Sequence, residues 1–435
     1  MRGLRGFRPR TDSLEEEMMK LRLLILFCSL ACTAQAQTVV IRAGNVIDPA
    51  HGTVAKNQII LVRDGKIAEV GPNVAVPRDA TVVDLSNAWV LPGLMDAHTH
   101  LTAGPAPGTP AAIITPYLME STALRALRGA HHARVLLEAG ITVVKDIGND
   151  AEYAAVDLRR AIARGWIPGP TMLTTGKIIA AFGGQSRGVP PEQGPFWRHE
   201  YIDADSPDEI RKAVRRNIYY GANAIKLVAD NNPYFYSQEE VRAAVEEGHA
   251  AGVTVAVHVV GGQAARNVIL AEPDSIEHGF ELSDEQLRLM KEKGIVLVGT
   301  DFPEEHLKLM DFNPVREGKT MGQRIVDRLR RAHQIGVKMA FGTDVYMDLP
   351  EKSRADLTWD YLDVWRAAGV PPAEILKAMT TNAAELMRIE KQRGALAPGL
   401  AADIIATPEN PLENIQALRR VHFVMKDGKI VKHTR

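Results

Sequence analysis

The ten residues from Leu91 to His100 read LPGLMDAHTH, an apolar run that ends in two histidines. Residues at positions i and i+2 of an extended segment face the same side. His98 and His100 can therefore present two imidazole rings to one ion. A lone His-x-His pair is a weak signal, so its meaning depends on what the rest of the chain places beside it.

Short apolar runs with polar ends continue along residues 91–394, and helical patterns such as 239–251 and 284–293 lie between them. This alternation is typical of βαβ units on a parallel sheet. Eight runs predict an α/β fold, a (β/α)₈ TIM barrel, with its active site at the carboxyl ends of the strands. The eight runs end near Asp96 (after Trp89-Val90-Leu91), Asp146, Thr175, Lys226, His258, His278, Thr300 and Asp344.

The two ends of the chain predict a second, smaller domain. Residues 37–90 contain short strand-like segments, and residues 62–67 have a near copy at 425–430. Both copies hold Asp-Gly between apolar residues, which is a strong hairpin signal. We expect one discontinuous β-sandwich domain formed by residues 37–90 and 395–435.

The composition indicates a soluble globular protein with a small partner. The 435 residues are 46% hydrophobic and 24% charged, and 52 basic residues are balanced by 53 acidic ones. This balance gives no electrostatic reason to expect nucleic acid as a partner. The sequence leaves open whether the protein forms a homo-oligomer.

Residues 1–36 resemble a secretory signal peptide. A basic start at residues 19–22 precedes the apolar run 23–31 and a small-x-small site at 34–36, and translation is expected to start at Met19. The apolar run is too short to span a bilayer. We therefore expect a periplasmic or secreted protein with no membrane-spanning segment after cleavage. Cys28 and Cys32 lie in the leader, so the mature chain would have no thiolate ligand; a lipid on Cys32 is the alternative, although residues 29–31 fit such a site poorly.

The order of the motifs resembles the amidohydrolase superfamily. Residues 91–100 resemble its opening metal motif, Gly342-Thr343-Asp344 its aspartate motif, Ile276-Glu277-His278-Gly279 its later histidine site, and 394–404 its return to the β domain. Lys226 stands where a binuclear branch of the superfamily carries a carboxylated lysine. Within the superfamily the chain looks most like the imidazolonepropionase-related, prolidase-like enzymes, of which Xaa-Pro dipeptidases are an example.

The resemblance implies a binuclear metal centre. His98, His100 and Asp344 would hold one divalent ion, His258 and His278 the other, and Lys226, carboxylated by carbon dioxide, would bridge both. The alternative is an unmodified Lys226 paired with Asp344. Imidazole and carboxylate donors suit Zn²⁺, the expected ion.

The resemblance also implies a reaction. A hydroxide that bridges the metals would attack an amide carbonyl, and Asp344 would act as the catalytic base and then the acid. The expected substrate is a dipeptide or an N-acyl amino acid. Cyclic amide hydrolysis, as in imidazolonepropionase, is the alternative reaction, and a secreted binding protein without activity is a third possibility.

Four residues of two loops are candidates for substrate binding: Gln185, Arg187, Tyr234 and Tyr236. The fork of Arg187 can bind a substrate carboxylate, and the aromatic residues can line the pocket or only pack on the barrel. Relatives often carry a Gly-Gly-His-Gly loop where this chain has Gly183-Gly184-Gln185-Ser186, and a histidine where it has Val260. These departures weaken the transfer of substrate specificity.

Overall fold

The computed structural model describes residues 38–104, 118–148, 151–186, 190–230, 234–349 and 351–434. The predicted leader and Arg187 lie outside these residues, and both remain predictions. Within the described residues, the longest helices are too short or too polar to cross a membrane.

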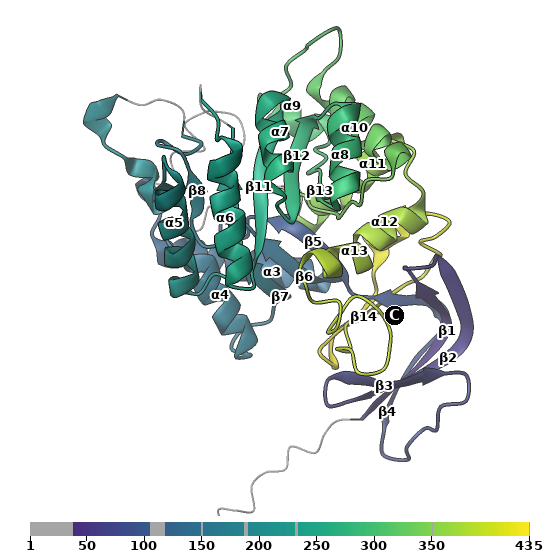
Figure 1. Ribbon diagram of the computed structural model, residues 1–435. Coiled ribbons are helices and arrows are strands. Elements are labelled where there is room, and N and C mark those ends of the chain that lie inside the picture. Colours follow the sequence, from purple (N-terminus) through teal and green to yellow (C-terminus); the bar gives the residue numbers. More distant parts are fainter. Residues whose placement is uncertain are drawn as a thin grey trace, which may run out of the picture.

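A (β/α)₈ barrel forms the larger part of the molecule, and the small domain lies at one end of it (Figure 1). The predicted α/β barrel fold is thus confirmed. The barrel strands are β5 (Leu94–Thr99), β6 (Ile141–Asp146), β7 (Thr171–Thr174), β10 (Ala224–Val228), β11 (Thr254–Gly261), β12 (Ser275–Glu281), β13 (Val296–Val298) and the extended segment 339–344. Two short strands, β8 (Ile178–Ala180) and β9 (Tyr201–Asp203), extend the sheet beside β10.

The segment 339–344 closes the barrel. On one side, the Ala340 amide donates to the Leu297 carbonyl of β13 at 3.0 Å. On the other side, the Ala97 amide of β5 donates to the Phe341 carbonyl at 2.8 Å, and the Asp344 amide donates to the His98 carbonyl at 2.7 Å. The first and last strands of the barrel therefore lie side by side.

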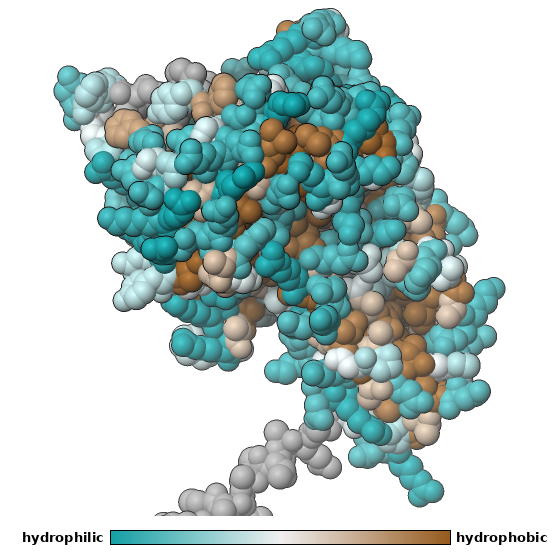
Figure 2. All heavy atoms as spheres, viewed as in Figure 1, coloured by the Kyte–Doolittle hydropathy of each residue, from teal (hydrophilic) through white to brown (hydrophobic). Residues whose placement is uncertain are grey.

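The helices follow from amphipathic segments with clear start signals. Ser237, Ser283 and Thr320 each accept a hydrogen bond from a backbone amide three residues later, and each belongs to a capping box. The outer sides of the helices that surround the barrel form a mostly hydrophilic surface (Figure 2). The helices are α3 (Thr122–Glu138), α4 (Ala154–Ala163), α5 (Pro207–Tyr220), α6 (Gln238–Ala250), α7 (Gly262–Ala271), α8 (Asp284–Lys293), α9 (Glu304–Leu309), α10 (Met321–Ile335), α11 (Arg354–Ala367), α12 (Pro372–Ala378) and α13 (Thr381–Leu386), with short 3₁₀ turns at Pro191–Gln193, Phe196–His199 and Ile415–Arg420.

The small domain is one seven-stranded sheet built from both ends of the chain, with the order β16-β15-β14-β4-β1-β2-β3. The sheet curls so far that its two ends meet: the Ile67 amide donates to the Leu400 carbonyl, and the Asp-Gly turns at Gly65 and Gly428 are in contact. The sandwich-like core thus lies within one continuous sheet. The strands are β1 (Val39–Asp48), β2 (Thr53–Arg63), β3 (Lys66–Gly71), β4 (Thr81–Pro92), β14 (Ile404–Thr407), β15 (Phe423–Lys426) and β16 (Lys429–His433).

One strand assignment from the sequence is wrong. Trp89-Val90-Leu91 belongs to β4 of the small domain, where it pairs with β14, and the first barrel strand begins at Leu94. Gly93 separates the two strands, because any larger residue there would place its Cβ only 2.2 Å from the Thr142 hydroxyl. Both strands are apolar, so hydrophobicity alone merged them into one run.

We predict that Gly428→Ala lowers the free energy of unfolding more than Gly399→Ala does. Both glycines have a positive φ, of 75° and 89°, so both variants incur similar backbone strain of about 1–3 kcal/mol. Only at residue 428 would the new Cβ lie 2.7 Å from the Gly65 Cα, whereas the space at residue 399 is open. Urea unfolding should show a further loss of about 1–3 kcal/mol for Gly428→Ala. Equal losses in the two variants would contradict the contact between the turns.

Candidate active site

The two histidines of the His-x-His pair reach the barrel interior from the end of β5. His98 Nδ1 lies 2.6 Å from Glu277 Oε2, and His100 Nδ1 lies 2.8 Å from the Gly148 carbonyl. Each ring thus uses its Nδ1 atom for a protein contact. The Nε2 atoms of both rings face Asp344 Oδ1, at 3.4 Å from His98 and 3.0 Å from His100.

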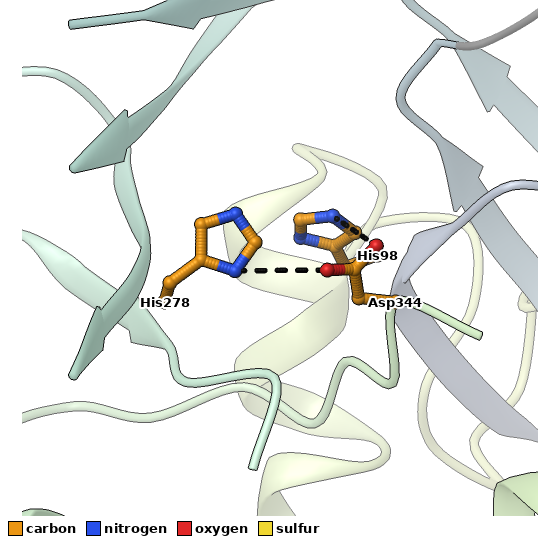
Figure 3. A group of neighbouring side chains, drawn as sticks. All are labelled: His98, His278 and Asp344. Carbon is orange, nitrogen blue, oxygen red and sulfur yellow. Dashed lines mark ion pairs between the residues drawn. The ribbon is translucent and has the colours of Figure 1, made fainter. Parts of the chain in front are cut away.

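Asp344 lies between His98 and His278, and its two carboxylate oxygens point toward the two rings (Figure 3). Its second carboxylate oxygen, Oδ2, is 3.7 Å from His278 Nδ1. Donor atoms of His98, His278 and Asp344 all lie within 4.8 Å of one another. The three residues come from β5, β12 and the closing segment, so the cluster depends on barrel closure.

Three non-glycine residues at the ends of the last barrel strands have left-handed backbone: His278 (φ 67°), Thr300 (φ 42°) and Asp344 (φ 57°). Such conformations cost free energy and cluster at functional sites. Side chains normally alternate across a strand, yet Glu277 and His278 both reach the same cluster. The Thr300 hydroxyl lies 2.7 Å from His278 Nδ1 and fixes that ring.

His258, on β11, extends the cluster on the other side. Its ring centroid lies 4.4 Å from that of His278. Its Nε2 atom is buried and has no hydrogen-bond partner within the described part of the chain. The nearest carboxylate oxygen, Asp230 Oδ1, is 3.5 Å from it. An unsatisfied buried imidazole nitrogen is the feature expected of an atom that binds an ion.

Lys226 projects into the same interior from β10 and is 2% exposed. Burial lowers its pKa to about 8, even though the charges of Glu277 and Asp344 act in the opposite direction. No carboxylate oxygen lies within 4 Å of its amine among the residues that the structure describes. The predicted alternative, an ion pair between Lys226 and Asp344, is therefore not formed.

Burial and mutual charge decide the protonation of the other groups. Burial, reinforced by the charge of Lys226, lowers the pKa of His258 to about 3, and burial also holds the pKa of His278 well below its usual range. Burial alone would raise the pKa of Asp344, but His98 and His100 hold it well below its usual range. Neutral imidazoles and an ionised carboxylate are the protonation states that bind metals.

The residues present therefore fit a divalent metal centre. Four imidazoles, one carboxylate and one amine with a lowered pKa face one buried space. These donors suit Zn²⁺ and similar ions. The structure brings together all six predicted ligands: His98, His100, Lys226, His258, His278 and Asp344.

The predicted substrate-binding residues are placed less uniformly. Gln185 is partly buried and accepts a hydrogen bond from the Tyr201 hydroxyl at 3.2 Å. Tyr234 is 48% exposed, and its hydroxyl donates to the Phe182 carbonyl. Tyr236 is 3% exposed and its hydroxyl donates to the Ala204 carbonyl, so the structure gives it a packing role in place of the predicted contact with substrate.

Sequence reasoning missed a group of polar residues behind the ligands. The Asp96 carboxylate accepts hydrogen bonds from the His98 amide at 3.0 Å and from the amide and hydroxyl of Thr343 at 3.1 and 2.7 Å. Lys145 and Glu277 are also fully buried, and Glu277 contacts both Lys145 and His98. Asp96, Lys145 and Glu277 are ionisable residues at the ends of apolar runs. This position in the sequence could have identified them as candidates for a functional role.

The buried cluster of imidazole, carboxylate and amine side chains lies at the carboxyl ends of the strands, where enzymes with a (β/α)₈ barrel have their active sites. The chain belongs to the amidohydrolase family, whose model matches residues 89–431. Members of this family are hydrolases that act on amide bonds. The match agrees with the resemblance of the sequence motifs to the amidohydrolase superfamily.

Individual relatives cover almost the whole chain. A crystal structure of a Xaa-Pro dipeptidase with methionine bound in the active site is 30% identical, with a TM-score of 0.81, and the match covers 91% of this chain and all of that one. A prolidase complexed with N-methylphosphonate-L-proline is 26% identical, with a TM-score of 0.80, over 92% of this chain and all of the other. Ochratoxinase from Aspergillus niger is 30% identical over 93% of this chain and 88% of its own length.

We predict that Asp96→Ala destabilises the protein strongly. The variant leaves the amides of His98 and Thr343 and the Thr343 hydroxyl without their acceptor. Each buried unsatisfied group costs about 1–3 kcal/mol, so the free energy of unfolding should fall by about 3 kcal/mol. Asp96→Asn keeps one acceptor oxygen for the two amides and should lose less than half as much. Chemical denaturation that gives equal losses for the two variants would refute the role of Asp96 as a clamp.

Proposed function

We propose that this protein is a binuclear metal-dependent amidohydrolase that cleaves the amide bond of a dipeptide or an N-acyl amino acid. The observation that carries the proposal is the position of Asp344. Its two oxygens reach the His-x-His pair on one side and His278 on the other, at distances of 3.0–3.7 Å. A single carboxylate thus touches both halves of the ligand set.

Divalent ions bound there would lower the pKa of a water molecule and polarise the substrate carbonyl. Asp344 is the group placed to accept the proton of that water at a carboxylate oxygen and to deliver it to the departing nitrogen. The hydrogen bond from its own backbone amide to His98 holds the residue in position. Thr300 and Glu277 orient the rings of His278 and His98 by their Nδ1 atoms.

Lys226 supports the binuclear form of the proposal. An amine with a pKa near 8 is neutral in about a tenth of the molecules at pH 7, far more than an ordinary lysine. The neutral amine can add carbon dioxide, with loss of one proton from nitrogen, and the product is a carbamate with two donor oxygens. Among the described residues, no carboxylate lies within 4 Å of the Lys226 amine, which supports this modification.

The substrate class rests on the relatives. Two of the similar structures are described as a Xaa-Pro dipeptidase and a prolidase, and the methionine and N-methylphosphonate-L-proline bound to them are an amino acid and an amino acid derivative. We extend this class to the present chain: an acyl group on one side of the cleaved bond and an amino acid on the other.

Turnover of a substrate panel tests the proposal. Zinc-loaded protein should release amino acids from Xaa-Pro dipeptides, other dipeptides or N-acyl amino acids, and Asp344→Asn should reduce kcat by about 10²–10⁴-fold through loss of proton transfer. Asp208→Asn, at a side chain 97% exposed, is the charge-matched control and should keep full activity. Turnover of cyclic amides alone would favour the alternative reaction. Full activity of Asp344→Asn would rule out its role.

Metal analysis tests the part of Lys226. We expect two zinc ions per chain in the parent protein and no more than one in Lys226→Ala, because the carbamate would supply a donor to each ion. Lys308→Ala removes an amine from a surface helix, where the side chain is 63% exposed, and should leave the metal content unchanged. One ion per chain in both the parent and Lys226→Ala would exclude the binuclear arrangement.

A further inference from the structure

Two buried charged residues in the barrel form a pair that takes no direct part in the bond cleavage of the proposed reaction. Lys145 on β6 and Glu277 on β12 have side chains that are 1% and 0% exposed. Burial of a charge costs several kcal/mol unless the group is paired and hydrogen-bonded. Because β6 and β12 are not neighbours in the barrel, the two side chains meet across its interior. The free-energy cost of burying this pair of charges suggests that the pair has a function in the candidate active site.

Glu277 uses both of its carboxylate oxygens. Oε2 lies 2.6 Å from His98 Nδ1, while Oε1 accepts the Ser275 hydroxyl and lies 3.6 Å from Lys145 Nζ. An ionised carboxylate can only accept hydrogen bonds, so in the neutral form of His98 that would bind a metal the hydrogen must lie on Nδ1. The lone pair of that ring is then on Nε2, the atom that faces Asp344. The contact therefore selects the tautomer that a metal needs.

Lys145 has one evident task. Within the described residues its amine makes no hydrogen bond, and Glu277 is the one carboxylate within 4 Å of it. At 3.6 Å, the contact is between two charges and is longer than a normal hydrogen bond. The lysine therefore serves as the counter-charge that makes an ionised Glu277 tolerable in the interior. The contrast with Lys226, which has no carboxylate at this range, separates the roles of the two buried lysines.

We infer that Glu277 and Lys145 are positioning residues for the metal centre: Glu277 holds the His98 ring with Nε2 toward the metal, and Lys145 acts on His98 only through Glu277. The inference rests on the proposed function, because it assumes that His98 is a metal ligand. It predicts that the two residues contribute to metal affinity as one unit.

Zinc affinity, measured by competition with a chelator at constant pH, tests the inference. We expect Glu277→Gln and Lys145→Met each to weaken zinc binding by about 10–100-fold, the usual effect of removing a group that orients a metal ligand. The double variant should bind about as weakly as Glu277→Gln alone, since Glu277 is the one carboxylate within 4 Å of Lys145 among the described residues. Lys145→Arg keeps the charge and should restore most of the affinity lost in Lys145→Met.

Ser275→Ala is the matched control, because it removes a contact of the same carboxylate oxygen but leaves the charge pair and the His98 contact intact. It should weaken zinc binding by less than about threefold. Thermal unfolding of the zinc-free variants separates positioning from stability. If unfolding temperatures fall while zinc affinities stay within about twofold of the parent, the pair is only structural and the inference is wrong.

Two further outcomes would also overturn it: additive losses in the double variant, or loss of one whole zinc ion in Lys145→Met, which would make Lys145 itself a ligand. The readout does not depend on catalysis. If the parent binds two zinc ions but hydrolyses no amide, the proposed function fails while the positioning pair remains testable. If the parent is active and Lys145→Met binds zinc normally, only the inference fails.

Discussion

The pairing of the first and last barrel strands is the constraint on which the candidate site depends. Two backbone hydrogen bonds, from Ala97 to Phe341 and from Asp344 to His98, join segments about 250 residues apart in the chain. The Asp96 carboxylate adds three side-chain contacts at the same place. Because the His-x-His pair lies on one of these strands and Asp344 on the other, the same contacts close the barrel and assemble the ligands.

The interior of the barrel is organised by charge as well as by apolar packing. Parallel strands such as β6 are buried along their whole length, which explains their continuous apolar runs. At their carboxyl ends the side chains change to imidazoles, carboxylates and amines, each with a defined neighbour. Lys145 is neutralised by Glu277, Asp344 faces the histidines, and Lys226 has no close carboxylate. Within the described residues, the interior thus holds one lysine paired with a carboxylate and one lysine without a close carboxylate.

Much of this arrangement could be predicted from the sequence, because periodicity and strand order depend on short segments. The apolar runs predict the eight strand ends and the polar residues that follow them, whereas the role of six of these residues as metal ligands is implied by the family resemblance. The first strand was misplaced, since Trp89–Leu91 and Leu94–Thr99 are equally apolar and only the close approach of Gly93 to Thr142 separates them. The left-handed backbone of His278 and Asp344 could not be predicted from the sequence, because neither residue is glycine. Tyr236 and Tyr234 are two positions apart, and only the packing shows that one is buried and the other exposed.

The order of the strands in the small domain has a consequence for the way the chain folds as it is made. Strand β4 pairs with β1 on one side and with β14 on the other, and some 300 residues of barrel lie between β4 and β14 in the chain. During synthesis, the edge of β4 that carries Trp89 and Leu91 has no partner until the whole barrel has emerged. Exposed apolar edges promote pairing with other chains. All the barrel residues must therefore be synthesised before β14 can cover this edge. A chain that ends before residue 404 would keep an unpaired, aggregation-prone strand edge.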